Sequence, residues 1–161
     1  MHDAGERKTI KSWKEIFIME NTKTFPDIAL GTWSWGVGAA GGDQVFGNHL
    51  GKEELKAVFD AGMKAGLNLW DTATVYGMGA SEEILGAFVK GCPDEEVILS
   101  AKFTPQIAGD GADPVADMCE ASMERLGTDC IDLYWIHNPA DVERWTPGPV
   151  SYTHLTLPTN S

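Results

Sequence analysis

The sequence has 161 residues, enough for one ordinary domain, and its 43% hydrophobic and 22% charged residues are typical of a globular chain. Its formal net charge of −12 argues against nucleic acid and anionic membrane surfaces as main partners, and no apolar run approaches the roughly 18–20 residues of a membrane-spanning helix. Three cysteines without metal-ligand spacing predict reduced thiols, no metal centre and a cytoplasmic location.

The first predicted strand covers residues 28–33 and ends in a glycine-rich segment. Residues 36–41 read G-x-G-x-x-G, the pattern of a dinucleotide-binding loop. That motif requires a tight turn that opens directly into a helix, whose N-terminus holds the pyrophosphate. Here the helical pattern begins only near Lys52, so we expect a flexible glycine-rich loop over the mouth of a barrel rather than a Rossmann loop.

A helix over residues 52–65 and a strand over residues 67–71 follow. The apolar stripe predicted for this helix consists of Leu55, Val58, Phe59, Gly62 and Met63. The next helix is expected to begin with Ser81 as its N-cap, with Glu82 and Glu83 near the positive end of the helix dipole. Its predicted buried side chains are Ile84, Leu85, Phe88 and Val89.

A third strand is predicted over residues 97–102 and a fourth over residues 131–137. Between them, Asp113 and Pro114 suit the start of a helix, and Gly127 suits its left-handed end. Alternating strands and helices of this kind predict a parallel sheet. Two architectures fit: a doubly wound open sheet, or an eight-fold βα barrel, of which these elements would form half.

Four polar side chains stand at or just past the ends of the last three strands: Asp71, Tyr76, Lys102 and His137. Each alone has an ordinary explanation, as a turn cap, a rim aromatic, a surface lysine or a core histidine. Neighbouring strands lie about 4.8 Å apart, so residues at their ends should meet. Lys102 shares a strand face with Ser100 by the period of two. An ammonium held there needs a charged partner, and Asp71 is the natural one.

Together these groups suit the donation of a proton to a carbonyl oxygen. A free phenol has a pKa of about 10 and is a weak acid at neutral pH, but an ammonium beside it stabilises the phenolate. A neutral His137 can donate a hydrogen bond that positions a carbonyl oxygen for Tyr76. The set lacks a reductant or a nucleophile, so a cofactor must supply one.

Six segments, in order over residues 26–139, resemble the N-terminal half of the aldo-keto reductase superfamily. They are LGTW at 30–33, DTAxxYG at 71–77, SExxLG at 81–86, AKF at 101–103, SxxRL at 122–126 and DLYxIH at 132–137. The family comprises nicotinamide-dependent reductases that usually use NADPH as cofactor and are built on a (β/α)8 barrel. The resemblance therefore implies an α/β fold of the TIM-barrel family, here truncated to about its first four βα units, and NAD(P)H-dependent reduction of an aldehyde or ketone.

The resemblance also implies a role for each matching residue. Tyr76 would be the proton donor, Lys102 the group that makes the phenol a stronger acid, Asp71 the residue that holds Lys102, and His137 the residue that orients the substrate carbonyl. The cofactor-binding residues would be Gly31, Thr32, Trp33 and Asp71. Trp33 and Trp35 could form an apolar substrate wall, or be exposed loop aromatics.

Outside the barrel segment at residues 19–149, the resemblance ends. Residues 1–18 are either an upstream stretch before a misassigned start or a basic extension. Residues 150–161 resemble no part of the family; residues 150–159 look like one reading-frame translation of a sequencing adapter, with a native Thr/Pro-rich tail as the alternative. Half a barrel leaves a strand edge unpaired, so we expect the chain to fold poorly and to be inactive alone.

Two functions remain open for the parent protein. The first is the reductase, with a small-molecule carbonyl substrate, NADPH as cofactor and neither nucleic acid nor membrane as partner. The second is a non-catalytic relative that binds a membrane channel or another partner, since such subunits keep the same site. The sequence leaves open the substrate, the choice between NADPH and NADH, and the oligomeric state.

Overall fold

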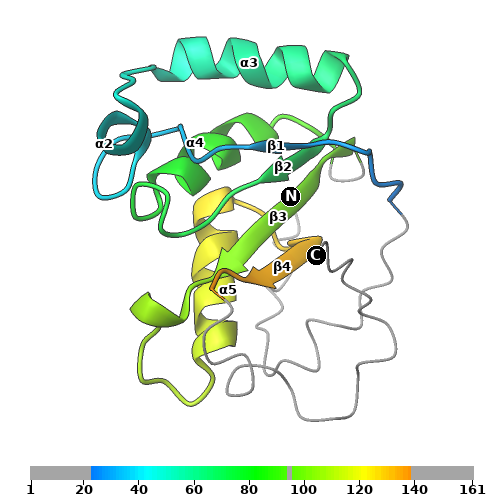
Figure 1. Cartoon of the computed structure of the whole chain (residues 1–161). Coiled ribbons are helices and arrows are strands. Elements are labelled where there is room, and N and C mark those ends of the chain that lie inside the picture. Colours follow the sequence, from blue (N-terminus) through cyan, green and yellow to red (C-terminus); the bar gives the residue numbers. More distant parts are fainter. Residues whose placement is uncertain (1–22, 94–95, 139–161) are drawn as a thin grey trace, which may run out of the picture.

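The structure, a computed structural model, describes residues 23–93 and 96–138. The predictions made for residues 1–18, 139–149 and 150–161 lie outside the described residues. Four strands form one parallel sheet in the order β1-β2-β3-β4 (Figure 1). They are β1 (Ala29–Gly31), β2 (Leu69–Asp71), β3 (Ile98–Phe103) and β4 (Leu133–Ile136).

Each strand pairs with the next strand along the chain. In a doubly wound sheet the strand order reverses at a switch point, whereas consecutive units of a βα barrel keep adding strands on the same side. The observed order therefore favours the barrel. The predicted parallel sheet is confirmed, although β1, β2 and β4 are shorter than the apolar runs that mark them and β3 is shifted by one residue.

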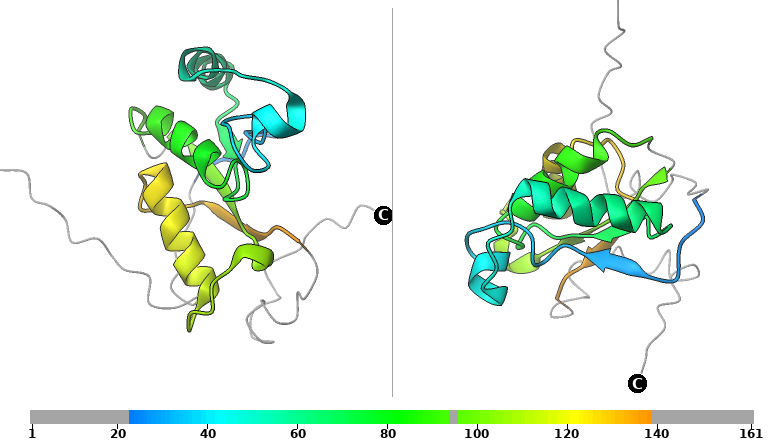
Figure 2. Two further views of the ribbon diagram at one scale, coloured as in Figure 1. Left: turned by 90° about the vertical axis from the view of Figure 1, so that its left-hand side faces the viewer. Right: turned by 90° about the horizontal axis from the view of Figure 1, so that it is seen from above.

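The helices are α2 (Gly42–Phe46), α3 (Lys52–Lys64), α4 (Ala80–Val89) and α5 (Pro114–Leu126), with a short 3-10 helix η2 at Pro105–Ile107. The three long helices, α3 to α5, lie on one face of the sheet (Figure 2). In the part of the chain that the structure describes, no helix is long and apolar enough to cross a membrane.

The core lies between these helices and the sheet. Its buried members are Trp35, Leu55, Phe59, Trp70, Leu85, Phe88, Val89, Val97, Leu99 and Leu126. Trp70 of β2 stacks on Phe59 of α3 with ring centroids 4.8 Å apart. Gly62 permits this contact, because a Cβ there would lie 3.0 Å from the Trp70 ring. Val58, which the helical spacing places in the buried stripe, is 49% exposed, so that part of the prediction is wrong.

Helix α5 begins and ends as the sequence predicts. Asp113 accepts a hydrogen bond from the backbone N–H of Ala116 at 3.1 Å, and Pro114 occupies the first turn. Gly127 ends the helix with a φ of 67°, in the left-handed region that favours glycine.

Helix α4 begins differently from the prediction. Its N-cap is Gly79, with a φ of 99°, and Ser81 lies inside the helix. The Ser81 hydroxyl donates to the backbone oxygen of Thr32 at 2.8 Å instead of capping the helix. The N-cap prediction is wrong because tertiary contact with the loop after β1 captures this hydroxyl.

The glycine-rich segment at residues 36–41 also differs from the prediction. Helix α2 begins directly after it, at Gly42, whereas the apolar pattern indicates no helix before Lys52. This helix has only five residues, too few to show a periodic pattern. The strand order, rather than the loop, separates the two architectures: β1 is an edge strand of the described sheet, not the centre of a dinucleotide-binding fold.

Candidate active site

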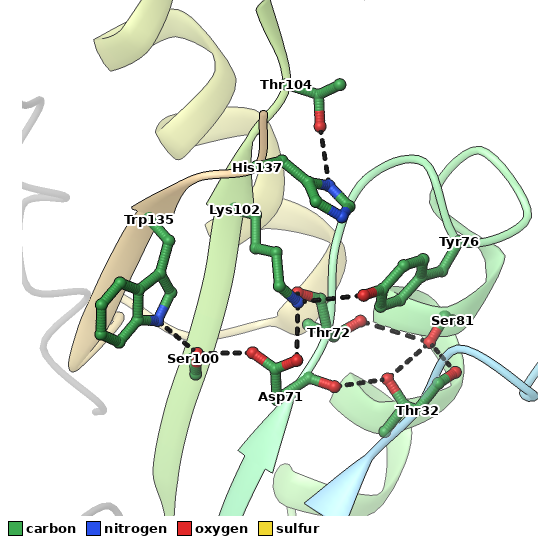
Figure 3. A network of polar contacts seen from close by, with 10 residues as sticks. All are labelled: Thr32, Asp71, Thr72, Tyr76, Ser81, Ser100, Lys102, Thr104, Trp135 and His137. Atoms are coloured by element: carbon green, nitrogen blue, oxygen red, sulfur yellow. Dashed lines mark hydrogen bonds and ion pairs between the residues drawn. The ribbon is translucent and has the colours of Figure 1, made fainter. Parts of the chain in front are cut away.

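The four polar residues that the sequence singles out lie at one edge of the sheet (Figure 3). Asp71 is the last residue of β2, Lys102 lies near the end of β3, and His137 directly follows β4. Tyr76 comes from the loop between β2 and α4. The carboxyl ends of parallel strands meet at the same edge, which explains why side chains from three strands converge.

The Lys102 ammonium organises this cluster. Its Nζ lies 2.6 Å from Asp71 Oδ2, 2.8 Å from the Thr72 backbone oxygen and 3.1 Å from the Tyr76 hydroxyl. An ammonium has three protons and accepts none, so three acceptors use all of its donors. The Tyr76 oxygen must therefore accept from Lys102, which leaves the phenol's own proton free for another acceptor. The Lys102 side chain is only 14% exposed, so this arrangement is shielded from water.

The loop that carries Tyr76 has an unusual backbone. Gly77, Met78 and Gly79 all have positive φ, at 64°, 51° and 99°. Glycine is needed at the last of these, since a Cβ on Gly79 would lie 2.7 Å from the Arg125 side chain. The turn reverses the chain at once after Tyr76 and directs it into α4, which holds the phenol over the strand ends.

Aromatic rings flank the Tyr76 phenol. The Trp33 ring stacks on it with centroids 5.7 Å apart, and Phe46 meets Trp33 edge-on at 5.2 Å. Trp33 is 45% exposed and so is accessible at the site. Trp35 is only 3% exposed and packs on Trp70 in the core. The expectation that Trp35 forms part of a substrate wall is therefore wrong.

His137 faces Tyr76 from β4. Their ring centroids lie 5.7 Å apart, and His137 Nδ1 lies 3.2 Å from the Thr104 hydroxyl. Burial lowers the pKa of the His137 imidazole, the nearby Lys102 ammonium lowers it further, and Asp71 opposes this effect. The imidazole is therefore neutral at pH 7. If Thr104 donates to Nδ1, then Nε2 carries the single ring proton.

The residues predicted to bind a cofactor lie beside this cluster, with one exception. A Cβ on Gly31 would have no atom within 4 Å, so the space beside that residue is open. The Asp71 side chain is 29% exposed and Trp33 is half-exposed. The Thr32 side chain is instead fully buried, and its hydroxyl donates to the Asp71 backbone oxygen at 3.1 Å. The Thr32 side chain thus joins the end of β1 to β2 and does not face the open space beside Gly31.

Three residues of the site have no role assigned by the sequence pattern: Ser100, Thr104 and Trp135. Ser100 donates to Asp71, Thr104 pairs with His137, and Trp135 donates to Ser100. The period of two along a strand was the available signal, because it places Ser100 with Lys102 and Trp135 with His137. Among the described residues, no group of three His, Cys, Asp or Glu side chains could hold a metal ion.

Comparison with known proteins identifies the family. Residues 27–147 match the model described as the aldo/keto reductase family. The chain belongs to this family. Aldo-keto reductase str7 of Strobilurus tenacellus is 37% identical over 111 residues, which are 67% of this chain and 32% of that protein. Methylglyoxal reductase YeaE of Escherichia coli K12 is 36% identical over 114 residues, 71% of this chain and 36% of the relative.

Solved structures of aldo-keto reductases agree with this assignment. An aldo/keto reductase from Klebsiella pneumoniae, crystallised with NADP and acetate, matches with a TM-score of 0.56 and 33% identity, over 73% of this chain and 37% of that one. The thermostable aldo-keto reductase Tm1743 in complex with epalrestat matches with a TM-score of 0.59 and 30% identity, over 71% of this chain and 40% of that one. The chain thus spans about a third of the length of the curated relatives it matches. The predicted fold class, a truncated (β/α)8 barrel, is confirmed.

Proposed function

We propose that the protein to which this chain belongs reduces an aldehyde or ketone to an alcohol with NAD(P)H, and that Tyr76 donates the proton. The observation that carries this proposal is the saturated Lys102 ammonium, which makes the Tyr76 oxygen an acceptor and leaves the phenol proton free.

The residues beside the cluster fit one end of a nicotinamide cofactor. The space beside Gly31 is open, Trp33 offers an exposed aromatic surface, and Asp71 has a partly exposed carboxylate. When bound, the nicotinamide supplies a hydride to the carbonyl carbon. The solved Klebsiella pneumoniae relatives contain NADP or NADPH, which supports NADP as the cofactor here.

The chain's own residues supply the proton half of the reaction. Neutral His137 donates a hydrogen bond to the carbonyl oxygen and holds it near the Tyr76 hydroxyl. As negative charge develops on that oxygen, Tyr76 transfers its proton to it. The Lys102 ammonium then stabilises the phenolate that remains, and Asp71 keeps Lys102 in place.

The substrate is proposed to be a small carbonyl compound. The relatives named methylglyoxal reductase and D-threo-aldose 1-dehydrogenase support this class. The half-exposed Trp33 and Phe46 rings form an apolar border on the Tyr76 side of the site. The free thiols of Cys92 and Cys119 support the expected cytoplasmic location.

Removing the phenolic oxygen of Tyr76 tests whether this residue is the proton donor. In the full-length protein, Tyr76→Phe should lower kcat for carbonyl reduction by about 10²–10⁴-fold, the usual contribution of a general acid, and leave the Kd of NADPH unchanged. Tyr134→Phe is the matched control, because it removes the same atom from a half-buried tyrosine whose hydroxyl is buried near Cys119 and Glu82 rather than near Lys102. Wild-type turnover in Tyr76→Phe would refute the assignment.

A second experiment tests the 161-residue chain itself, which we propose is inactive alone. The described sheet has four strands, and an unpaired strand edge favours association with other chains. We expect poor soluble yield and no saturable NADPH binding by fluorescence titration. A soluble monomer that binds one NADPH per chain would overturn this proposal and leave the assignment of Tyr76 untouched.

A further inference from the structure

We propose that Ser100 and Trp135 are positioning residues for Asp71, and through it for Lys102 and Tyr76. The inference rests on the proposed function and extends it to two residues that contact neither the phenol nor the imidazole. Figure 3 shows the chain of contacts from the Trp135 indole, through Ser100 and Asp71, to the Lys102 ammonium.

The strand register brings these side chains to one face. Asp71 of β2 lies opposite Ser100 of β3, and Lys102 of β3 lies opposite Trp135 of β4. Ser100 and Lys102 are two residues apart and so point the same way. The result is a row across three strands, with Ser100 between the carboxylate of Asp71 and the indole of Trp135.

Proton counting sets the direction of each hydrogen bond. An indole N–H can only donate, so Ser100 Oγ accepts from Trp135 Nε1 at 2.9 Å. The Ser100 hydroxyl has one proton, and the Asp71 carboxylate can only accept. Ser100 therefore donates to Asp71 Oδ1, at 2.7 Å. A hydroxyl that accepts one hydrogen bond donates the next one more strongly, so Trp135 strengthens the contact between Ser100 and Asp71.

Each oxygen of the Asp71 carboxylate then has its own partner. Oδ1 accepts from Ser100, and Oδ2 accepts from Lys102 at 2.6 Å. Ser100 is only 3% exposed, so water does not easily replace it. Without the Ser100 hydroxyl, the Asp71 carboxylate is free to rotate. Its pair with Lys102 then loosens, and the contact from Lys102 to Tyr76, which is the longest of the three at 3.1 Å, weakens with it.

Kinetics of full-length variants test the positioning role. Ser100→Ala should lower kcat about 10-fold with the Kd of NADPH unchanged, and Ser100→Thr, which keeps the hydroxyl, should restore most of the rate. Rescue by Ser100→Thr is the decisive comparison, because that variant keeps the hydroxyl that donates to Asp71 while changing the packing around it. If Ser100 only filled space, the rate would not depend on whether the substituted side chain keeps a hydroxyl.

The contribution of Trp135 is tested by a double-mutant cycle. Trp135→Phe keeps an aromatic ring but removes the N–H, and should lower kcat about 3-fold. Because Trp135 acts through Ser100, the double variant Ser100→Ala/Trp135→Phe should be no slower than Ser100→Ala alone. If the losses in kcat from the two single variants multiplied in the double variant, the proposed hydrogen-bond chain would be overturned. An unchanged kcat in Ser100→Ala would overturn it as well.

A spectroscopic readout separates this inference from the proposed function. The indole N–H resonance of Trp135, assigned by its absence from Trp135→Phe, should shift in Ser100→Ala and stay near its wild-type position in Ser100→Thr. A signal that is unmoved in Ser100→Ala would overturn the hydrogen-bond chain whatever the activity. Wild-type turnover in Tyr76→Phe would refute the proposed function instead, and the indole signal would still show whether the hydrogen bonds from Trp135 through Ser100 to Asp71 are formed.

Discussion

Breaking the buried ion pair between Glu82 of α4 and Arg125 of α5 should strongly destabilise this fold. Glu82 is fully buried, and its Oε2 lies 2.6 Å from Arg125 Nε. The Arg125 guanidinium also donates to Thr74 at 3.0 Å and to Ser122 at 3.3 Å. Arg125→Met removes all three hydrogen bonds and leaves an unpaired carboxylate in the core.

The expected loss follows from that environment. Removing one partner of a buried pair costs about 3–5 kcal/mol, because the remaining charge keeps its desolvation penalty. The Glu82 Oε1 atom already has no hydrogen-bond partner among the described residues, so the carboxylate has no second donor to turn to. Replacing both partners, as in Glu82→Gln/Arg125→Met, should recover much of the loss, since no buried charge remains.

Urea unfolding of the full-length protein, followed by circular dichroism, measures the difference. The exposed pair of Lys56 and Asp60 on α3 is the matched control, with side chains 45% and 59% exposed. Lys56→Ala should cost only about 0.3–0.5 kcal/mol. If Arg125→Met lost no more free energy of unfolding than Lys56→Ala, or if the double variant were worse than Arg125→Met, the reasoning from burial would be refuted.

Four further predictions follow from single features. The pKa of His137 is lowered in the folded protein, so as pH falls below about 6.5 the imidazole is protonated in the unfolded state before it is protonated in the folded state. The free energy of unfolding should therefore decrease as pH falls below about 6.5, and His137→Gln should remove this part of the pH dependence. A Cβ on Gly86 would lie 2.6 Å from backbone oxygens of α5, so Gly86→Ala should lower the free energy of unfolding by urea by about 1–3 kcal/mol. Gly109→Ala should not lower it, because a Cβ there would meet no atom within 4 Å. Asp113→Ala should lower thermal stability by about 1 kcal/mol while Asp113→Asn keeps the cap, and equal losses would contradict the capping role. Burial raises the pKa of Cys119 to about 12, so mass spectrometry should find its thiol unmodified by iodoacetamide at about pH 8 until the protein unfolds.

Much of the site could be predicted before any coordinates, because parallel strands bring their carboxyl ends together. Once residues 67–71, 97–102 and 131–137 are recognised as strands, Asp71, Lys102 and His137 must lie at one edge. Contacts that depend on the path of a loop could not be predicted. Ser81 reads as an N-cap in the sequence, yet its hydroxyl bonds the loop after β1, a residue 49 positions away.

The sequence by itself determined the order of the strands and long helices, the family and the residues that converge, because these depend on local periodicity and on short motifs. The tertiary structure alone decided which hydrogen bonds these residues make. Trp35 belongs to the core and Trp33 to the site, although both are tryptophans of the same loop. Lys102 meets three acceptors, and Ser100 stands between Asp71 and Trp135, because strand register and side-chain packing bring distant residues within hydrogen-bond distance. No pattern along one chain carries that information, since it depends on distances across three strands.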